Sequence, residues 1–116
     1  MTEPAPTQKL LFICTKNQVR SLTAEKLFAD SKQFTVRSAG TRSDARIAVT
    51  EAHLAWADII VCMERWHFSQ LREKFPTGMK GKRVVCLHII DEYYFMQREL
   101  VEEIHRQLGQ HLEIGT

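Results

Sequence analysis

The chain lacks the features that mark several classes of protein. Its charges nearly balance, because 16 Lys and Arg against 14 Asp and Glu leave a formal net charge of +2. Nucleic-acid-binding domains usually gather a basic excess on one face, whereas the basic residues here are scattered. No apolar run approaches the roughly 20 residues that span a bilayer. We therefore expect a soluble protein that binds neither nucleic acid nor membrane.

Cysteines are few, and their spacing does not match that of a metal site. The chain holds Cys14, Cys62 and Cys86, and no two of them stand at the C-x-x-C spacing of zinc sites. Its five histidines are dispersed, so we expect no metal and no cofactor. Residues 1–8 lack the apolar segment of a signal peptide. An odd cysteine count without such a signal favours a reducing, cytoplasmic location.

At 116 residues the chain is long enough for one domain. We expect a disordered lead-in over residues 1–8 and a single α/β domain over residues 9–116. Apolar runs predict strands at Lys9–Ile13, Phe34–Ser38, Asp58–Met63 and Arg83–Ile89. Helical spacing predicts helices at Leu22–Ser31 (with Ser21 as N-cap), Ala52–Trp56 (with Thr50 as N-cap), Glu64–Phe75 (anchored by Trp66, Phe68 and Leu71) and Met96–Leu112.

Strands that alternate with helices predict a parallel sheet with right-handed crossovers. Ligands of such sheets bind beyond the carboxyl ends of the strands. Cys14 directly follows the first strand, and Asp91 follows the fourth. We therefore expect these two side chains to lie at one edge of the sheet.

The loop after the first strand has the composition of an anion site that can also react. Cys14 opens it, Arg20 closes it, and a helix follows. Cations and helix N-termini favour the thiolate form of a cysteine, which is a nucleophile. A guanidinium can bind two phosphate oxygens in its fork. The predicted phosphate-binding residues run without a gap: Thr15, Lys16, Asn17, Gln18, Val19, Arg20 and Ser21.

Each of these assignments has a plainer alternative. Cys14 would then be a small buried apolar residue, as we expect Cys62 and Cys86 to be, and Arg20 a solvated charge at a helix start. Asn17 is expected to shape the loop through side-chain hydrogen bonds. Ser21 has two candidate roles, capping the helix or donating its hydroxyl to the Cys14 sulfur.

Hydrolysis of a phosphate ester also needs a general acid, because the leaving oxygen must take up a proton. Asp91 is the candidate, with Glu92 as the nearest competitor, and its alternative role is to cap a turn. The aromatic residues Trp66, Tyr93 and Tyr94, with Phe95, are candidates for a slot that holds an aryl phosphate. They are equally compatible with ordinary core or surface positions.

The stretch from Phe12 to Glu25 resembles the opening of the low-molecular-weight protein tyrosine phosphatases, and more closely a compact bacterial branch of them. Ser38-Ala39-Gly40-Thr41 is similar to the end of the family's second strand. The resemblance implies a four-stranded parallel sheet of order 2-1-3-4 with helices on both faces. It also implies catalytic roles for Cys14, Arg20 and Asp91 without a metal.

Several positions depart from the family pattern. Lys16 replaces a usual Gly, and Val19 replaces a frequent second loop cysteine. Asp91 is followed by Glu92 rather than Pro, and the compact branch has a later Asp-Pro where this chain has Gln97-Arg98. The segment between Thr41 and Asp58 is shorter than in most members, which implies a more open site.

The leading hypothesis is a metal-independent phosphomonoester hydrolase, a protein tyrosine phosphatase that forms a thiophosphate on Cys14. Its partner would be a phosphorylated protein or a small aryl phosphate. The alternative is a protein with the same cradle that binds phosphate or phosphopeptide with little turnover. Arsenate reduction is a third hypothesis, and it needs Cys62 and Cys86 to reach Cys14 in relay.

Overall fold

A computed structural model of the chain describes residues 7–114, so most of the expected lead-in (residues 1–6) lies outside the described residues. The elements are β1 (Gln8–Cys14), α1 (Arg20–Leu27), β2 (Phe34–Gly40), α2 (Glu51–Trp56), β3 (Ile59–Cys62), α3 (Arg65–Lys74), β4 (Arg83–Cys86) and α4 (Arg98–Leu108). Within residues 7–114, no helix has the length and apolar character needed to cross a membrane.

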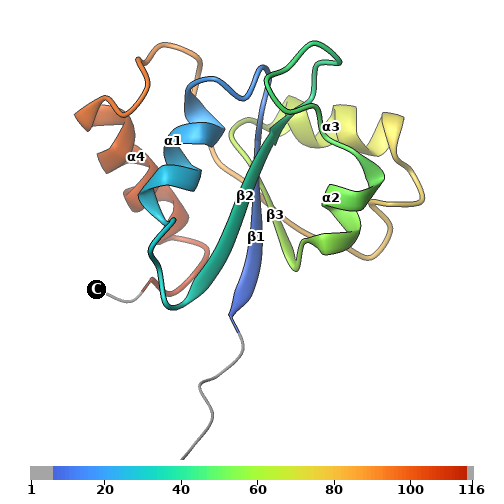
Figure 1. Cartoon of the computed structure of the whole chain (residues 1–116), viewed down its shortest axis with the longest axis horizontal. Coiled ribbons are helices and arrows are strands. Elements are labelled where there is room, and N and C mark those ends of the chain that lie inside the picture. The colour runs from blue at the N-terminus through green and yellow to red at the C-terminus, as the bar shows by residue number, and fades with distance from the viewer. Residues whose placement is uncertain (1–6, 115–116) are drawn as a thin grey trace, which may run out of the picture.

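The four strands form one parallel sheet in the order β2-β1-β3-β4, as predicted. β1 lies in its interior, with Cys14 paired to Gly40 of β2 and Ile13 paired to Cys62 of β3. Figure 1 shows the sheet nearly edge-on, with the connections that follow β1 and β2 at the same end. The sequence places Cys14 at this end, where ligands of parallel sheets bind.

Helices cover both faces of the sheet, also as predicted: α1 and α4 on one side, α2 and α3 on the other (Figure 1). Two apolar clusters result. Leu10 and Phe12 of β1 join the cluster under α1 and α4, and Leu11 and Ile13 join the one under α2 and α3. A strand covered on both faces needs a continuous apolar run, which explains why β1 does not alternate. Cys14 belongs to the first cluster.

Several element boundaries differ from those expected, among them the start of β1 at Gln8, inside the expected lead-in. α1 begins at Arg20 with Val19 as N-cap, so the prediction of Ser21 as the cap is wrong: its hydroxyl is already bonded to Cys14 and Asn17. β4 ends at Cys86 rather than Ile89. α4 starts at Arg98 rather than Met96, whose positive φ of 59° is not helical.

The anchors of α3 also differ from those expected. Leu71 is buried and Phe68 half-buried, as predicted, but Trp66 is 42% exposed. The fully buried residue of the first turn is instead His67. Its imidazole has polar partners inside the protein, which an indole at that position would not satisfy in the same way. Thr50 caps α2 as predicted, by accepting a hydrogen bond from the His53 N–H.

Candidate active site

The loop from Cys14 to Arg20 is tied along its backbone to the loop that follows β2. Thr41 N donates to the Cys14 carbonyl at 2.9 Å, Arg42 N to Thr15 O at 3.1 Å, and Arg46 N to Lys16 O at 3.0 Å. Gly40 makes this approach possible, because a Cβ at that position would lie 2.5 Å from Thr15 O. The two loops therefore form one rigid unit.

Asn17 shapes the inside of this loop. It is fully buried and adopts a left-handed conformation with a φ of 58°, which asparagine tolerates better than most residues. Its Nδ2 donates to Ser21 Oγ at 2.7 Å and to Ser38 Oγ at 2.8 Å. Ser38 in turn donates to Glu25 at 2.9 Å. These are the side-chain hydrogen bonds expected of Asn17, and they join β2 and α1 to the loop.

The Cys14 thiol lies at the base of the loop and is 3% exposed. Its sulfur is 2.9 Å from Ser21 Oγ. Because Asn17 already donates to that oxygen, the serine hydroxyl hydrogen is free to point at the sulfur. A hydroxyl that donates to sulfur stabilises a negative charge there. Of the two roles considered for Ser21, the structure is compatible with this one.

The Arg20 guanidinium is buried, and its partners fix its orientation. Nη1 donates to Glu64 Oε2 at 2.7 Å and to the Ile89 carbonyl at 2.8 Å. Nη2 donates to Thr15 Oγ1 at 3.2 Å, and Nε lies 3.9 Å from Asp91 Oδ1. Nη1 has thus used both of its hydrogens. The Nε and Nη2 edge, which can bind two oxygens side by side, faces Thr15 and Asp91.

Glu64 and His67 support this arrangement, and the sequence did not single out either of them. Burial of the Glu64 carboxyl opposes its ionisation, but hydrogen bonds from Arg20 and Trp66 outweigh it and lower the pKa. Burial, helped by the Arg20 charge, lowers the pKa of His67 to about 4. The imidazole is therefore neutral near pH 7, and its Nδ1 accepts from Glu64 N at 3.0 Å.

The neutral His67 ring then carries its proton on Nε2, which lies 3.0 Å from Thr15 Oγ1. Thr15 Oγ1 accepts from both His67 and Arg20, so its own hydroxyl hydrogen remains free to donate.

The sequence carried a signal that could have identified Glu64. It closely follows the buried strand β3 at the sheet edge that holds Cys14, the same reasoning that selected Asp91.

A small cavity of about 80 Å³ opens above the Cys14 thiol. Its lining brings together the three predicted catalytic residues and most of the predicted phosphate-binding ones: Cys14, Thr15, Lys16, Gln18, Val19, Arg20 and Asp91. The Asp91 side chain is 71% exposed at its mouth. Glu92 and Gln97 do not line it, and the Gln97 side chain is bonded instead to Tyr94 N and Glu99.

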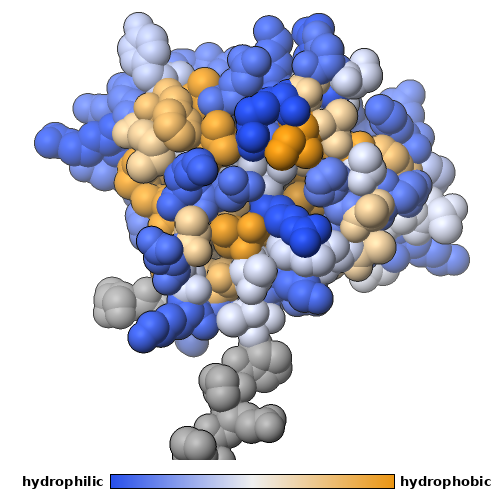
Figure 2. Space-filling view, viewed as in Figure 1, coloured by the Kyte–Doolittle hydropathy of each residue, from blue (hydrophilic) through white to orange (hydrophobic). Residues whose placement is uncertain are grey.

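The predicted aromatic slot is not part of this cavity lining. Trp66 donates its indole N–H to Glu64 Oε2 at 2.8 Å, the same oxygen that accepts from Arg20. Tyr93 packs partly against the core, and Tyr94 is 82% exposed. Together with Ile90, Phe95 and Met96, Tyr94 makes the loop before α4 an apolar surface, and Figure 2 shows apolar side chains gathered above α1 and α4.

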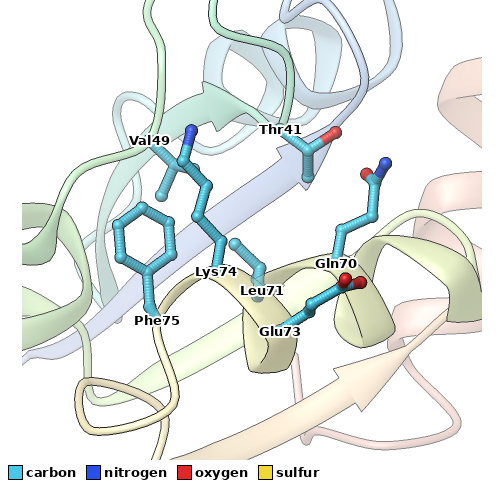
Figure 3. Close-up of a pocket in the computed structure, with 7 residues that line it drawn as sticks. All are labelled: Thr41, Val49, Gln70, Leu71, Glu73, Lys74 and Phe75. Atoms are coloured by element: carbon cyan, nitrogen blue, oxygen red, sulfur yellow. The ribbon is translucent and has the colours of Figure 1, made fainter.

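A larger cavity, of about 340 Å³, lies away from Cys14 between α3 and the chain after β2. Figure 3 shows its lining, in which Leu71, Lys74 and Phe75 come from α3 and its end, opposite Val49 and Thr41. None of the predicted site residues is among them. Within residues 7–114, no three His, Cys, Asp or Glu side chains come together as metal ligands would.

Comparison with known proteins agrees with this geometry. A family model described as low molecular weight phosphotyrosine protein phosphatase matches residues 9–49. These residues contain β1, the Cys14 loop, α1, β2 and the loop bonded to it. No curated protein matches the chain by sequence.

Solved structures of the same fold cover nearly the whole chain. SP-PTP, a low molecular weight protein tyrosine phosphatase from Streptococcus pyogenes, has a TM-score of 0.72 at 12% identity, over 92% of this chain and 95% of its own. The low molecular weight protein tyrosine phosphatase of T. tengcongensis has a TM-score of 0.69 at 21% identity, over 91% and 100%. The YwlE arginine phosphatase from Geobacillus stearothermophilus has 0.64 at 18% identity, over 93% and 99%.

These likenesses confirm the resemblance that the sequence predicted. The first part of the chain matches the family by sequence, and the rest shares its fold. At these identities the structural likeness concerns the fold alone.

Proposed function

We propose that this chain, which has the fold and the cysteine loop of the low-molecular-weight protein tyrosine phosphatases, hydrolyses phosphate monoesters with Cys14 as nucleophile. One observation carries the proposal: the Cys14 thiol, the Arg20 guanidinium and the Asp91 carboxyl line the same small cavity. The proposed substrate is a phosphorylated tyrosine of a protein or a small aryl phosphate. A reaction of this kind needs these three groups together.

In the first step the Cys14 sulfur attacks phosphorus in line with the ester oxygen. The Nε and Nη2 edge of Arg20 binds two of the phosphate oxygens, with loop N–H groups and the Thr15 hydroxyl as further donors. A sulfur–phosphorus bond forms and the phosphorus–oxygen bond to the leaving group breaks. Asp91 gives its proton to the leaving oxygen.

In the second step a water molecule attacks phosphorus, and the Asp91 carboxylate takes up the proton that the water loses. The sulfur–phosphorus bond breaks and Cys14 departs as a thiolate. The Ser21 hydroxyl, 2.9 Å away, stabilises that thiolate. The positive charge that the reaction requires comes from Arg20 and the backbone N–H groups.

Steady-state turnover of an aryl phosphate, a phosphotyrosine peptide and phosphoarginine tests the proposal. We expect the aryl phosphate and the phosphotyrosine peptide to be hydrolysed without added metal, vanadate to inhibit, and Cys14→Ser to reduce turnover to background. Cys86→Ser is the matched control, since Cys86 lies outside the cavity lining. Full activity of Cys14→Ser would refute the assignment of the nucleophile.

The same experiment separates hydrolysis from binding alone. A protein that only binds phosphate would show a higher melting temperature in inorganic phosphate while turnover stays at background in the wild type. Preference for phosphoarginine over both aryl substrates would contradict the proposed substrate class and leave the nucleophile assignment intact.

A further inference from the structure

Two cysteines that the proposed mechanism does not use face each other on the sheet. Cys62 ends β3 and Cys86 ends β4, and they are partners in the strand register. Neighbouring strands lie about 4.8 Å apart, which falls within the Cα separation of about 4.4 to 6.8 Å found across disulfides. Both side chains belong to the apolar cluster under α2 and α3, so they project from the same face of the sheet. A disulfide therefore requires only a small local adjustment.

The two thiols also differ in exposure and in pKa, and disulfide formation requires one of them to be accessible and ionised. Cys62 is fully buried, whereas Cys86 is partly exposed. The neighbouring Cys62 thiol, as a hydrogen-bond donor, and the nearby Arg65 charge lower the pKa of Cys86 to about 7 despite its partial burial. The same interaction, together with burial, raises the pKa of Cys62. Cys86 is therefore the accessible thiol with thiolate character, and Cys62 is the protonated neighbour that can resolve it.

Cys14 is kept apart from this pair by the sheet itself. Cys62 and Cys86 belong to the apolar cluster under α2 and α3, whereas Cys14 belongs to the cluster under α1 and α4. The sulfur atoms therefore lie on opposite faces of the sheet. This separation favours a Cys62–Cys86 bond over a bond from either residue to Cys14.

The pair is linked to the site through the partners of Arg20. Glu64 follows Cys62 by two residues, and Ile89 follows Cys86 by three. Both accept hydrogen bonds from Arg20 Nη1. Between them, Leu87 N donates to Cys62 O at 2.8 Å and Ile89 N to Met63 O at 3.0 Å. β4 is an edge strand with β3 as its one strand partner in the sheet, and the chain after it is also bonded to α4 through His88 and Gln107.

We propose that Cys62 and Cys86 are an oxidation site: hydrogen peroxide oxidises the two thiols to a reversible disulfide, and this bond loosens the support of Arg20. The bond draws the two Cβ atoms to about 3.8 Å. The ends of β3 and β4 shift with them, and Glu64 and the Ile89 carbonyl move relative to Arg20. The consequence for phosphate binding rests on the proposed function, whereas the formation of the disulfide does not.

The chemistry balances in two steps. The Cys86 thiolate attacks one peroxide oxygen, the oxygen–oxygen bond breaks, and, with one proton taken up, sulfenic acid and water result. The Cys62 sulfur then attacks the Cys86 sulfur, the sulfur–oxygen bond breaks, and the departing oxygen leaves as water with the Cys62 proton. The two thiols are oxidised together, and one peroxide is reduced to two molecules of water.

The full chain carrying Cys14→Ser tests the disulfide, because Cys62 and Cys86 are then its remaining thiols. We expect peroxide to remove both thiols, to lower the mass by two hydrogen atoms, and to yield a peptide that joins Cys62 to Cys86. Dithiothreitol should reverse all three changes. In the same background, Cys62→Ala should stop Cys86 at the sulfenic acid, which dimedone traps. Separate oxidation of the two thiols, or a bond between two chains, would overturn the proposal.

Binding of inorganic phosphate to the oxidised and reduced forms of the Cys14→Ser protein tests the link to Arg20. We expect affinity to fall about tenfold on oxidation, the effect of weakening one charged hydrogen bond. Equal affinities would overturn the link. Wild-type protein that forms the disulfide but does not hydrolyse aryl phosphate would contradict only the proposed function. Normal hydrolysis without a disulfide would contradict only this inference.

Discussion

Arg20 and Glu64 are joined by a 2.7 Å hydrogen bond between Nη1 and Oε2, although 44 positions separate them in the chain. Arg20 is 3% exposed and Glu64 21%, so the pair is largely withdrawn from water. With the Ile89 carbonyl it uses both hydrogens of Nη1. Glu64 therefore decides which edge of the guanidinium faces the cavity.

Replacing Glu64 by Gln should test this positioning role. The amide keeps the size of the side chain and removes its charge, so Arg20 gains freedom to turn. We expect kcat/KM for an aryl phosphate to fall roughly tenfold to a hundredfold, the equivalent of one lost charge-assisted hydrogen bond. The measurement is steady-state kinetics with the separate effects on kcat and KM. Glu92→Gln, which also removes one carboxylate and lies outside the cavity lining, should retain wild-type rates.

Asp91→Asn should slow turnover of aryl phosphates by roughly 10² to 10⁴-fold, the usual contribution of a general acid or base. The deficit should shrink as the leaving group becomes more acidic, since a good leaving group needs no proton. A series of phenyl phosphates with increasingly acidic phenols measures this trend. A uniform loss across the series would instead mark Asp91 as a residue that orients Arg20, from which it is 3.9 Å away.

Asn17 can be tested by two substitutions that differ only in backbone freedom. Asn17→Ala removes the hydrogen bonds to Ser21 and Ser38 and places a Cβ-bearing residue without a polar side chain at a φ of 58°. We expect its free energy of unfolding to fall by about 3 kcal/mol. Asn17→Gly relieves the backbone and should lose about 1 kcal/mol less. Urea denaturation measures both, and equal losses would show that backbone strain is unimportant here.

Stability should decline on mild acidification because of His67. Its pKa is about 4 in the folded protein and about 6.5 when unfolded, so between these values the unfolded chain binds more protons. The stability contribution is therefore intact above pH 6.5 and is lost as the pH falls towards 4. We expect His67 to account for about 2 kcal/mol of lost unfolding free energy at pH 5.

Denaturation of the wild type and of His67→Gln at pH 7 and pH 5 measures this contribution of His67 to the free energy of unfolding. The variant should be less stable at pH 7, because its partners Thr15 and Glu64 N lose the imidazole. Its stability should also change less between the two pH values than that of the wild type. An identical change in both proteins would show that other groups cause the acid sensitivity.

Much of the architecture was predictable because it follows from local patterns. The continuous apolar run of β1 indicates a strand covered on both faces, and strands that alternate with helices indicate a parallel sheet. The placement of Cys14 and Asp91 at one edge follows from that topology alone. Ser21 shows the limit of such reasoning: as a good N-cap residue it predicted a helix start, but its hydroxyl is bonded to Cys14 and Asn17.

By itself, the sequence determined the Cys14-to-Arg20 loop, the fold that presents it and the position of Asp91 in the segment that follows the fourth strand. Only the tertiary structure decided which groups hold Arg20, that His67 is buried and neutral, and that Cys62 faces Cys86. The physical reason is distance along the chain. Hydrophobic periodicity and loop spacing act between near neighbours, whereas Thr15 and His67 are 52 positions apart. Such groups meet only once strand order and register have brought β1, β3 and β4 side by side.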